Sequence, residues 1–242
     1  MARVEGPPRQ LDVVASQMVL EDVQGRVLFP TPNQGPWVPF VRFAETQTTG
    51  GGFEPEAHSH QEEEVFNYIL EGRVEYEDDA GRRSILGEGT VALLTARTEA
   101  RHNLTRRGGE PARWVSMVVR CQSKRGPAHL VQVAAEPPAV PAAQAISPEP
   151  VERHLVGPEA PVASSSGLQV LEVEFRKPGR CTCPIGQERR AVVYVIDGSL
   201  FVDNQRIEAA AGALLEDVTD VALRSETKTR VLLASAPRGG PR

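Results

Sequence analysis

The sequence predicts an all-β protein built of two tandem barrels. Three observations support this fold class: short apolar runs separated by turn residues, a pattern that recurs in both halves of the chain, and a proline-rich segment between the halves. With 242 residues, the chain is long enough for two small β domains. Its 21 glycines and 20 prolines also favour short strands joined by turns.

The predicted strands are short runs rich in apolar and β-branched residues. The run VFNYIL at 65–70 ends at Glu71-Gly72, and RVEY at 73–76 leads to a turn at 78–81. The later runs lie at 90–95, 114–119, 168–175, 191–196, 199–202 and 213–215. Short strands with turn signals between them are typical of an all-β sandwich or barrel.

The two halves of the chain resemble each other. Residues 68–76 (YILEGRVEY) align with 194–202 (YVIDGSLFV), 126 residues later, and the segment from Gly89 (GTVALL) aligns with that from Gly212 (GALL), 123 residues later. The residues lost in the second copy fall in a hairpin, where Asp203-Asn204 suits a two-residue β-turn. Each copy is too short to form two separate sheets, so we expect its strands to close into a compact barrel or jelly roll.

A segment dense in Ala, Pro, Glu and Ser separates the halves. Its prolines exclude a helix or an interior strand, and they occur at positions 137, 138, 141, 148 and 150. We therefore predict a first barrel at 1–133, a connection at 134–166, and a second barrel with its tail at 167–242.

Composition narrows the choice of compartment and partners. The formal net charge of −5 argues against direct nucleic-acid binding. No window approaches the length of an apolar membrane span, and residues 1–12 carry no apolar signal segment, so we expect a cytoplasmic protein without membrane contact. Alternation in a strand places the thiols of Cys181-Thr-Cys183 on one face, and we expect them to be reduced.

The histidines predict a metal site. His58 and His60 are two residues apart, so a strand would point both side chains to the same side. Glu64 can return from the next strand, and His102 can return from a later one. Imidazole nitrogens with a carboxylate oxygen suit one divalent transition metal, and these residue types leave Fe²⁺, Mn²⁺, Ni²⁺, Cu²⁺ and Zn²⁺ open.

These residues also carry a family resemblance. The chain resembles the cupin superfamily, whose first motif reads G-x5-H-x-H-x3,4-E-x6-G, at Gly52, His58, His60, Glu64 and Gly72. The seven-residue interval between Glu64 and Gly72 is similar to that of the pirin-like bicupins, as are the segments 27–32 and 89–102. The resemblance implies a bicupin with one metal ion, iron first, in its N-terminal barrel.

The chain departs from the pirin pattern at one position. Pirins usually have a Glu two residues after the third histidine, and this chain has Leu104 there. Three alternatives follow: Glu64 supplies the carboxylate, the site has three histidines with water completing it, or metal affinity has been lost.

The second barrel has no predicted metal site. At the two fixed offsets, the positions of His58, His60, Glu64 and His102 correspond to Pro184, Gly186, Arg190 and Ser225. We expect this barrel to cover edge strands of the first barrel or to form a wall of a ligand cavity.

Two function classes remain open. The resemblance implies a metal-dependent, quercetinase-like dioxygenase acting on a small enolic or flavonol substrate, with Glu64 as ligand or general base and Phe53, Phe66 and Tyr68 as candidate cavity walls. The alternative is a non-catalytic bicupin that binds a small molecule, or a regulatory one similar to the pirins that act as transcription cofactors.

Overall fold

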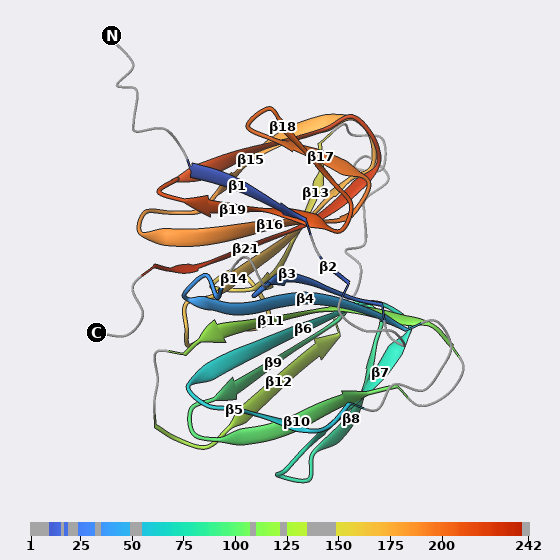
Figure 1. Cartoon of the computed structure of the whole chain (residues 1–242), viewed down its shortest axis with the longest axis vertical. Coiled ribbons are helices and arrows are strands. Elements are labelled where there is room, and N and C mark those ends of the chain that lie inside the picture. The colour runs from blue at the N-terminus through green and yellow to red at the C-terminus, as the bar shows by residue number, and fades with distance from the viewer. Residues whose placement is uncertain are drawn as a thin grey trace.

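The computed structural model describes residues 10–15, 17–18, 24–31, 35–48, 55–106, 110–121, 125–134 and 149–238. Every regular element in these ranges is a β-strand, and the strands form two stacked barrels (Figure 1). The prediction of an all-β protein with two tandem barrels is therefore confirmed. No helix in the described part of the chain is long and apolar enough to cross a membrane.

The first barrel combines a seven-stranded and a four-stranded sheet. The larger sheet has the order β12 (His129–Ala134), β9 (Thr90–Ala96), β6 (Glu63–Glu71), β11 (Ala112–Arg120), β4 (Phe40–Thr48), β3 (Gln24–Phe29) and β2 (Gln17–Met18). The smaller sheet has the order β5 (His58–His60), β10 (Ala100–Thr105), β7 (Arg73–Asp78) and β8 (Arg83–Gly87).

The second barrel repeats this plan. Its six-stranded sheet has the order β1 (Gln10–Ala15), β19 (Ala211–Glu216), β16 (Arg189–Asp197), β21 (Thr229–Pro237), β14 (Gln169–Phe175) and β13 (Val151–Val156). Its four-stranded sheet has the order β15 (Gly179–Pro184), β20 (Asp220–Ser225), β17 (Ser199–Val202) and β18 (Gln205–Glu208).

Two strands pair outside the domain ranges predicted from the sequence. β1 pairs with β19, and Figure 1 shows this blue strand among the orange and red strands of the second barrel. β13 lies within the predicted connection and pairs with β14 as an edge strand, which suits its position directly after Pro150. Residues 135–148 of that connection lie outside the described residues. The domain ranges 1–133, 134–166 and 167–242 remain a proposal. In the structure, β1 and β13 both pair with strands of the second barrel.

A shared hydrophobic core joins the barrels. It includes Phe43, Phe66 and Tyr68 from the first barrel and Val192 and Tyr194 from the second. The ring centroids of Phe43 and Tyr194 lie 4.9 Å apart. Because this core forms between the two large sheets, the central strands of each are buried on both faces.

The side chains of strand β6 alternate between the core that joins the barrels and the interior of the first barrel. Its even-numbered side chains Phe66 and Tyr68 belong to the core between the barrels, whereas Val65 and Ile69 pack inside the first barrel. This follows from the period of two in a strand. Any polar residue on β6 therefore faces either the inside of the barrel or the neighbouring barrel.

Candidate metal centre

Strands β5 and β10 bring the three predicted histidines together. In the antiparallel register His58 lies opposite His102, while His60 lies opposite Ala100. The ring centroids are 4.9 Å apart for His58–His60, 4.8 Å for His58–His102 and 5.1 Å for His60–His102. One nitrogen from each ring lies within 4.8 Å of the others, so a single ion could contact all three.

Glu63 orients one of these rings. Its carboxylate oxygen Oε2 lies 2.8 Å from His60 Nδ1, and its other oxygen lies 3.2 Å from Arg120 Nη1. A carboxylate that binds one imidazole nitrogen leaves the other nitrogen free for a metal and fixes the plane of the ring. The sequence interpretation missed Glu63, although its odd number places it on the same face of β6 as Val65 and Asn67.

Three buried imidazole nitrogens have no hydrogen-bond partner among the described residues. They are Nε2 of His60 and both ring nitrogens of His102. Buried polar atoms are normally paired, and leaving one unpaired costs about 1–3 kcal/mol. A metal ion held by the three rings would give His60 and His102 one partner each, so these residues fit the implied ion.

Burial also keeps His58 and His102 in the neutral form that binds metals. Burial, with smaller contributions from His58 and His60, lowers the pKa of His102 to about 3. Burial and the neighbouring His60 lower the pKa of His58 as well. Neutral imidazole is the metal-binding form, so no proton has to be removed from His102 near neutral pH.

The histidines open into a cavity of about 390 Å³ inside the first barrel. Its walls are mainly apolar, and Ser116 Oγ donates a hydrogen bond of 2.7 Å to Asn67 Oδ1 on one side. The lining residues are Arg42, Ala44, Thr46, Pro55, His58, His60, Val65, Asn67, His102, Leu104, Trp114, Ser116 and Val118. A concave, largely apolar site with a few convergent polar groups is the usual form of a small-molecule pocket.

The structure does not bring Glu64 to the histidines. Glu64 is an even-numbered residue of β6, so its fully buried side chain points toward the second barrel. Its two carboxylate oxygens accept hydrogen bonds from Thr95 on β9 and from backbone and hydroxyl groups of the segment before β14, namely Ser164, Ser165 and Ser166. The expectation that Glu64 is a metal ligand or a general base therefore has no support in this geometry.

The electrostatics of Glu64 match this structural role. Burial on its own would raise the pKa of Glu64, but the hydrogen bonds from Ser164, Ser166 and Ser165 outweigh it and hold the pKa below its usual value. A carboxylate that stays charged without a cation beside it needs such a set of donors. The serine run carries no motif that identifies it in the sequence.

The expected cavity walls also need correction. Phe66 and Tyr68 face the core between the barrels, so neither lines the histidine cavity, and Phe53 lies outside the described residues, as does Gly52. Leu104 lies two residues beyond His102 and lines the cavity. An apolar side chain therefore occupies the wall where the pirin pattern has a carboxylate.

Strand pairing identifies the equivalent residues of the two barrels, and it differs from the fixed offsets along the sequence. Tyr76 pairs with Leu104 in the first barrel, and Val202, its counterpart 126 residues later, pairs with Leu223 in the second. Counting back two residues along β20 makes Val221 the counterpart of His102, instead of Ser225.

The same register places new residues at the other two histidine positions. Val221 pairs with Cys183, just as His102 pairs with His58, so Cys183 and Ile185 replace Pro184 and Gly186 as counterparts of His58 and His60. All three counterparts belong to the buried core of the second barrel. None of these three positions holds a histidine, and one of them holds a thiol.

Comparisons with known proteins agree with this fold and site. A cupin domain model matches residues 45–118. A candidate quercetin 2,3-dioxygenase of Pseudomonas aeruginosa is 28% identical over 204 residues, which cover 76% of this chain and 70% of that protein. A pirin-like protein of Caulobacter vibrioides is 24% identical over 213 residues, covering 79% of this chain and 71% of that protein.

Solved structures show the same fold. The crystal structure of the bacterial pirin YhhW from Escherichia coli in complex with nickel(II) has a TM-score of 0.81 and 15% identity, and the match covers 95% of this chain and all of that one. At this identity the likeness establishes the fold alone.

Proposed function

We propose that this chain is a pirin-like bicupin of the cupin superfamily, which it resembles in sequence and fold, and that its first barrel holds one divalent transition metal. His58, His60 and His102 would bind the ion, with iron as the first candidate and manganese, nickel, copper or zinc as alternatives. The chemical function proposed for this site is a quercetinase-like dioxygenase activity on a small enolic or flavonol substrate.

The buried nitrogens without partners carry the proposal. The rings of His60 and His102 are almost fully enclosed, and among the described residues His60 Nε2 and both nitrogens of His102 have no hydrogen-bond partner. Imidazole is a common ligand for iron, copper, nickel and zinc. Glu63 supports the same interpretation, because its hydrogen bond with Nδ1 is placed to fix the His60 ring.

The cavity supports a small-molecule ligand. Its volume falls within the usual range of about 300–1,000 Å³ for ligand pockets. A transition metal bound there would supply open coordination positions for an oxygen substrate. Asn67 and Ser116 offer hydrogen bonds on one wall, and the exposed Arg42 offers a positive charge toward an anionic, enolate-like group.

A non-catalytic binder is the second candidate, and one observation favours it. Among the described residues that line the cavity, none is Asp or Glu, so no carboxylate there can take a proton from a bound enol. A dioxygenase would need an imidazole or a bound hydroxide for this step. A protein that only binds a small molecule would not need such a group.

Metal analysis is the first test. The untagged protein, purified without chelators, is analysed by plasma mass spectrometry next to a His58→Ala, His60→Ala variant. We expect close to one transition metal per chain in the wild type and a loss of at least tenfold in the variant. Metal far below one per chain, even after iron, manganese, nickel and copper are added, would contradict the proposal.

Oxygen uptake separates the two candidates. The metal-loaded protein is mixed with quercetin in an oxygen-electrode cell, and the His58→Ala, His60→Ala variant is the control. Uptake that depends on both metal and flavonol supports the dioxygenase. Saturable quenching of tryptophan fluorescence by quercetin without oxygen uptake supports the binder, since Trp114 lines the cavity.

A further inference from the structure

Edge strands of the two sheets of the second barrel bring two cysteines and a carboxylate together. β13 is an edge strand of the six-stranded sheet, and β15 is an edge strand of the four-stranded sheet. Glu152 on β13 and the two cysteines of β15, Cys181 and Cys183, form a group whose ligand atoms all lie within 4.8 Å of one another. Apart from the three histidines, this is the only such group among the described residues.

The sulfur atoms have the spacing of a tetrahedral metal site. Cys181 Sγ and Cys183 Sγ are 3.8 Å apart. Two zinc–sulfur bonds of about 2.3 Å at the tetrahedral angle place their sulfurs about 3.8 Å apart. A disulfide would need a separation of about 2.05 Å, so the sulfurs would have to move nearly 2 Å closer.

The position of the group in the fold is independent support. Cys183 occupies the place on β15 that His58 occupies on β5, as the two strand registers show. Strand alternation points Cys181 to the same side as Cys183, and Glu152 reaches them from the neighbouring sheet edge. The second barrel thus has metal-binding residue types on the strand that carries the histidine pair in the first.

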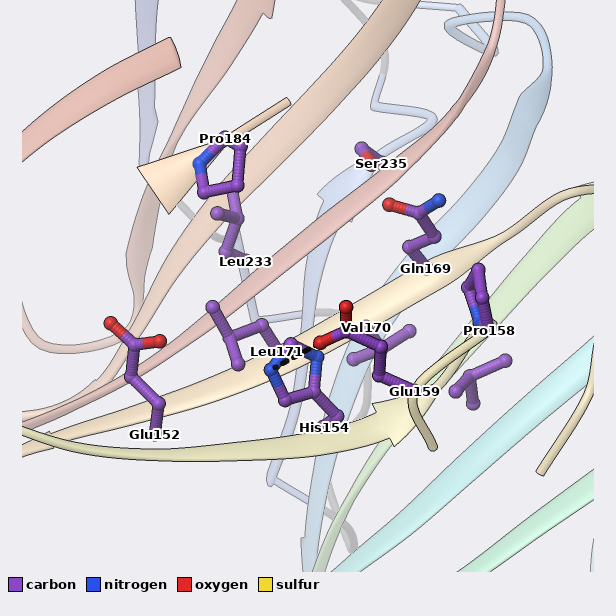
Figure 2. Close-up of a pocket in the computed structure, with 11 residues that line it drawn as sticks. Glu152, His154, Pro158, Glu159, Gln169, Val170, Leu171, Pro184, Leu233 and Ser235 are labelled. Atoms are coloured by element: carbon purple, nitrogen blue, oxygen red, sulfur yellow. Dashed lines mark ion pairs between the residues drawn. The ribbon is translucent and has the colours of Figure 1, made fainter. Parts of the chain in front are cut away.

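A pocket of about 320 Å³ adjoins the group. Figure 2 shows the side chains of Glu152 and His154 rising from the same side of β13, with Pro184 at the end of β15 across the pocket. His154 Nε2 lies 3.6 Å from the Glu159 carboxylate. An ion held by the cysteines and Glu152 would therefore have a neighbouring pocket from which water or a ligand could complete its coordination.

We propose that Cys181, Cys183 and Glu152 form a second metal site that takes Zn²⁺ or a similar thiophilic divalent cation. The three residues supply two thiolates and one carboxylate, and the fourth position is open toward the pocket. Binding forms two metal–sulfur bonds and releases the two thiol protons to solvent. The ion would link the edges of the two sheets. This site is separate from the histidine site and does not depend on its function.

Cobalt is the probe that separates the two sites. Co²⁺ is added without oxygen to the chelator-stripped full chain, with its thiols kept reduced by a phosphine. Thiolate ligands give intense near-ultraviolet charge-transfer absorption with Co²⁺, and imidazole ligands do not. We expect this absorption to saturate at one Co²⁺ per chain and to disappear when Zn²⁺ is added, in the wild type and in the His58→Ala, His60→Ala variant.

Variants assign the ligands. Cys181→Ser, Cys183→Ser should abolish the charge-transfer absorption, and Glu152→Gln should weaken Co²⁺ binding by more than the roughly 10- to 100-fold loss typical of an outer-shell partner. Cys121→Ser is the matched control, because Cys121 lies in the first barrel and is hydrogen-bonded to Ser165. The Co²⁺ absorption of this variant should match that of the wild type.

Three results would overturn the second site. The first is that added Co²⁺ gives no charge-transfer absorption, although a thiol reagent shows that all three cysteines of the chain are reduced. The second is absorption that survives Cys181→Ser, Cys183→Ser but is lost in Cys121→Ser. The third is an intact mass two hydrogens lower in both the wild type and Cys121→Ser, which would show a Cys181–Cys183 disulfide. The first is read from the wild type, and the third from the wild type and the Cys121→Ser control, so misfolding of one variant leaves the test valid.

Discussion

The hydroxyl of Tyr68 donates a 3.0 Å hydrogen bond to the carboxylate of Glu172 across the boundary between the two barrels. The counterpart of Tyr68, which is Tyr194, donates a 3.2 Å hydrogen bond to Glu45 in the opposite direction. Each barrel therefore supplies a tyrosine to a buried glutamate of the other.

An arginine completes each pair. Arg230 lies 2.7 Å from Glu172, and Arg113 lies 3.0 Å from Glu45. These ion pairs compensate the charge of the buried carboxylates, which would otherwise be costly. The interface thus has approximate two-fold symmetry, as expected when two copies of one domain pack through the same face.

Replacing Tyr68 by Phe is predicted to weaken the interface. Tyr68→Phe removes a donor to a buried carboxylate, which should lower the free energy of unfolding by about 1–2 kcal/mol. Burial and Glu172 raise the pKa of Tyr68 to about 12, so its hydroxyl stays a donor throughout the neutral range. Urea denaturation measures the loss, and Tyr194→Phe should show a similar one. Unchanged midpoints in both variants would contradict the assigned role.

Replacing Glu64 by Gln is predicted to destabilise the fold without removing the metal. The amide cannot accept from all of the serine donors, so we expect a loss of about 3 kcal/mol. Metal content should match that of the wild type, because Glu64 faces away from the histidines. Exposed Glu88→Gln is the control. A metal-free but stable Glu64→Gln protein would show that Glu64 is a ligand after all.

The same residue predicts a dependence of stability on pH. Folding lowers the pKa of Glu64, so the ionised carboxylate stabilises the folded state. This contribution is complete above the pKa of the unfolded chain, about 4.3, and is lost as pH falls through the lower pKa of the folded state. Unfolding free energies measured between pH 3 and pH 6, roughly the range where carboxylates titrate, should fall less steeply toward acid in Glu64→Gln than in the wild type. Parallel curves would contradict this.

Glu63 is predicted to tune the affinity of the histidine site. Glu63→Gln weakens the hydrogen bond that holds the His60 ring, so metal affinity should fall by about 10- to 100-fold while the fold is kept. Competition with a metal indicator measures the change. Glu99→Gln is the control. Glu99 accepts a hydrogen bond from Ser59, the residue between the two histidines of β5, and not from a histidine ring.

Leu104 offers a gain-of-function test. Leu104→Glu places a carboxylate two residues from His102 on the cavity wall, so we expect metal affinity to rise by about tenfold or more. Without metal the same variant should be less stable than the wild type, since it buries a charge without a partner. Leu104→Gln has nearly the same shape without the charge and should not gain affinity. Equal affinities in the two variants would exclude a ligand position at 104.

Much of the fold and the centre of the site could be predicted from local sequence. The strand runs, the repeat of Tyr68 and Tyr194 and the His58-Ser-His60 pair all follow from periods and spacings along the chain. A period of two is a property of any extended strand, so it places two histidines on one side whatever surrounds them.

Sequence alone could not assign Glu64 to a face. β6 is buried on both faces, so alternation separates Glu63 from Glu64 but does not say which of them faces the histidines. That choice depends on the second barrel, which covers one face and supplies Ser164, Ser165 and Ser166 to Glu64.

The sequence by itself determined the all-β class, the duplication and the three-histidine set, because these depend on residues close together or on direct repetition. Only the tertiary structure decided that β1 pairs with β19, that Cys183 is the counterpart of His58, and that Glu152 lies beside it. The physical reason is that strand register is set by backbone pairing between distant segments, and connections of different length shift it independently of any fixed offset along the chain.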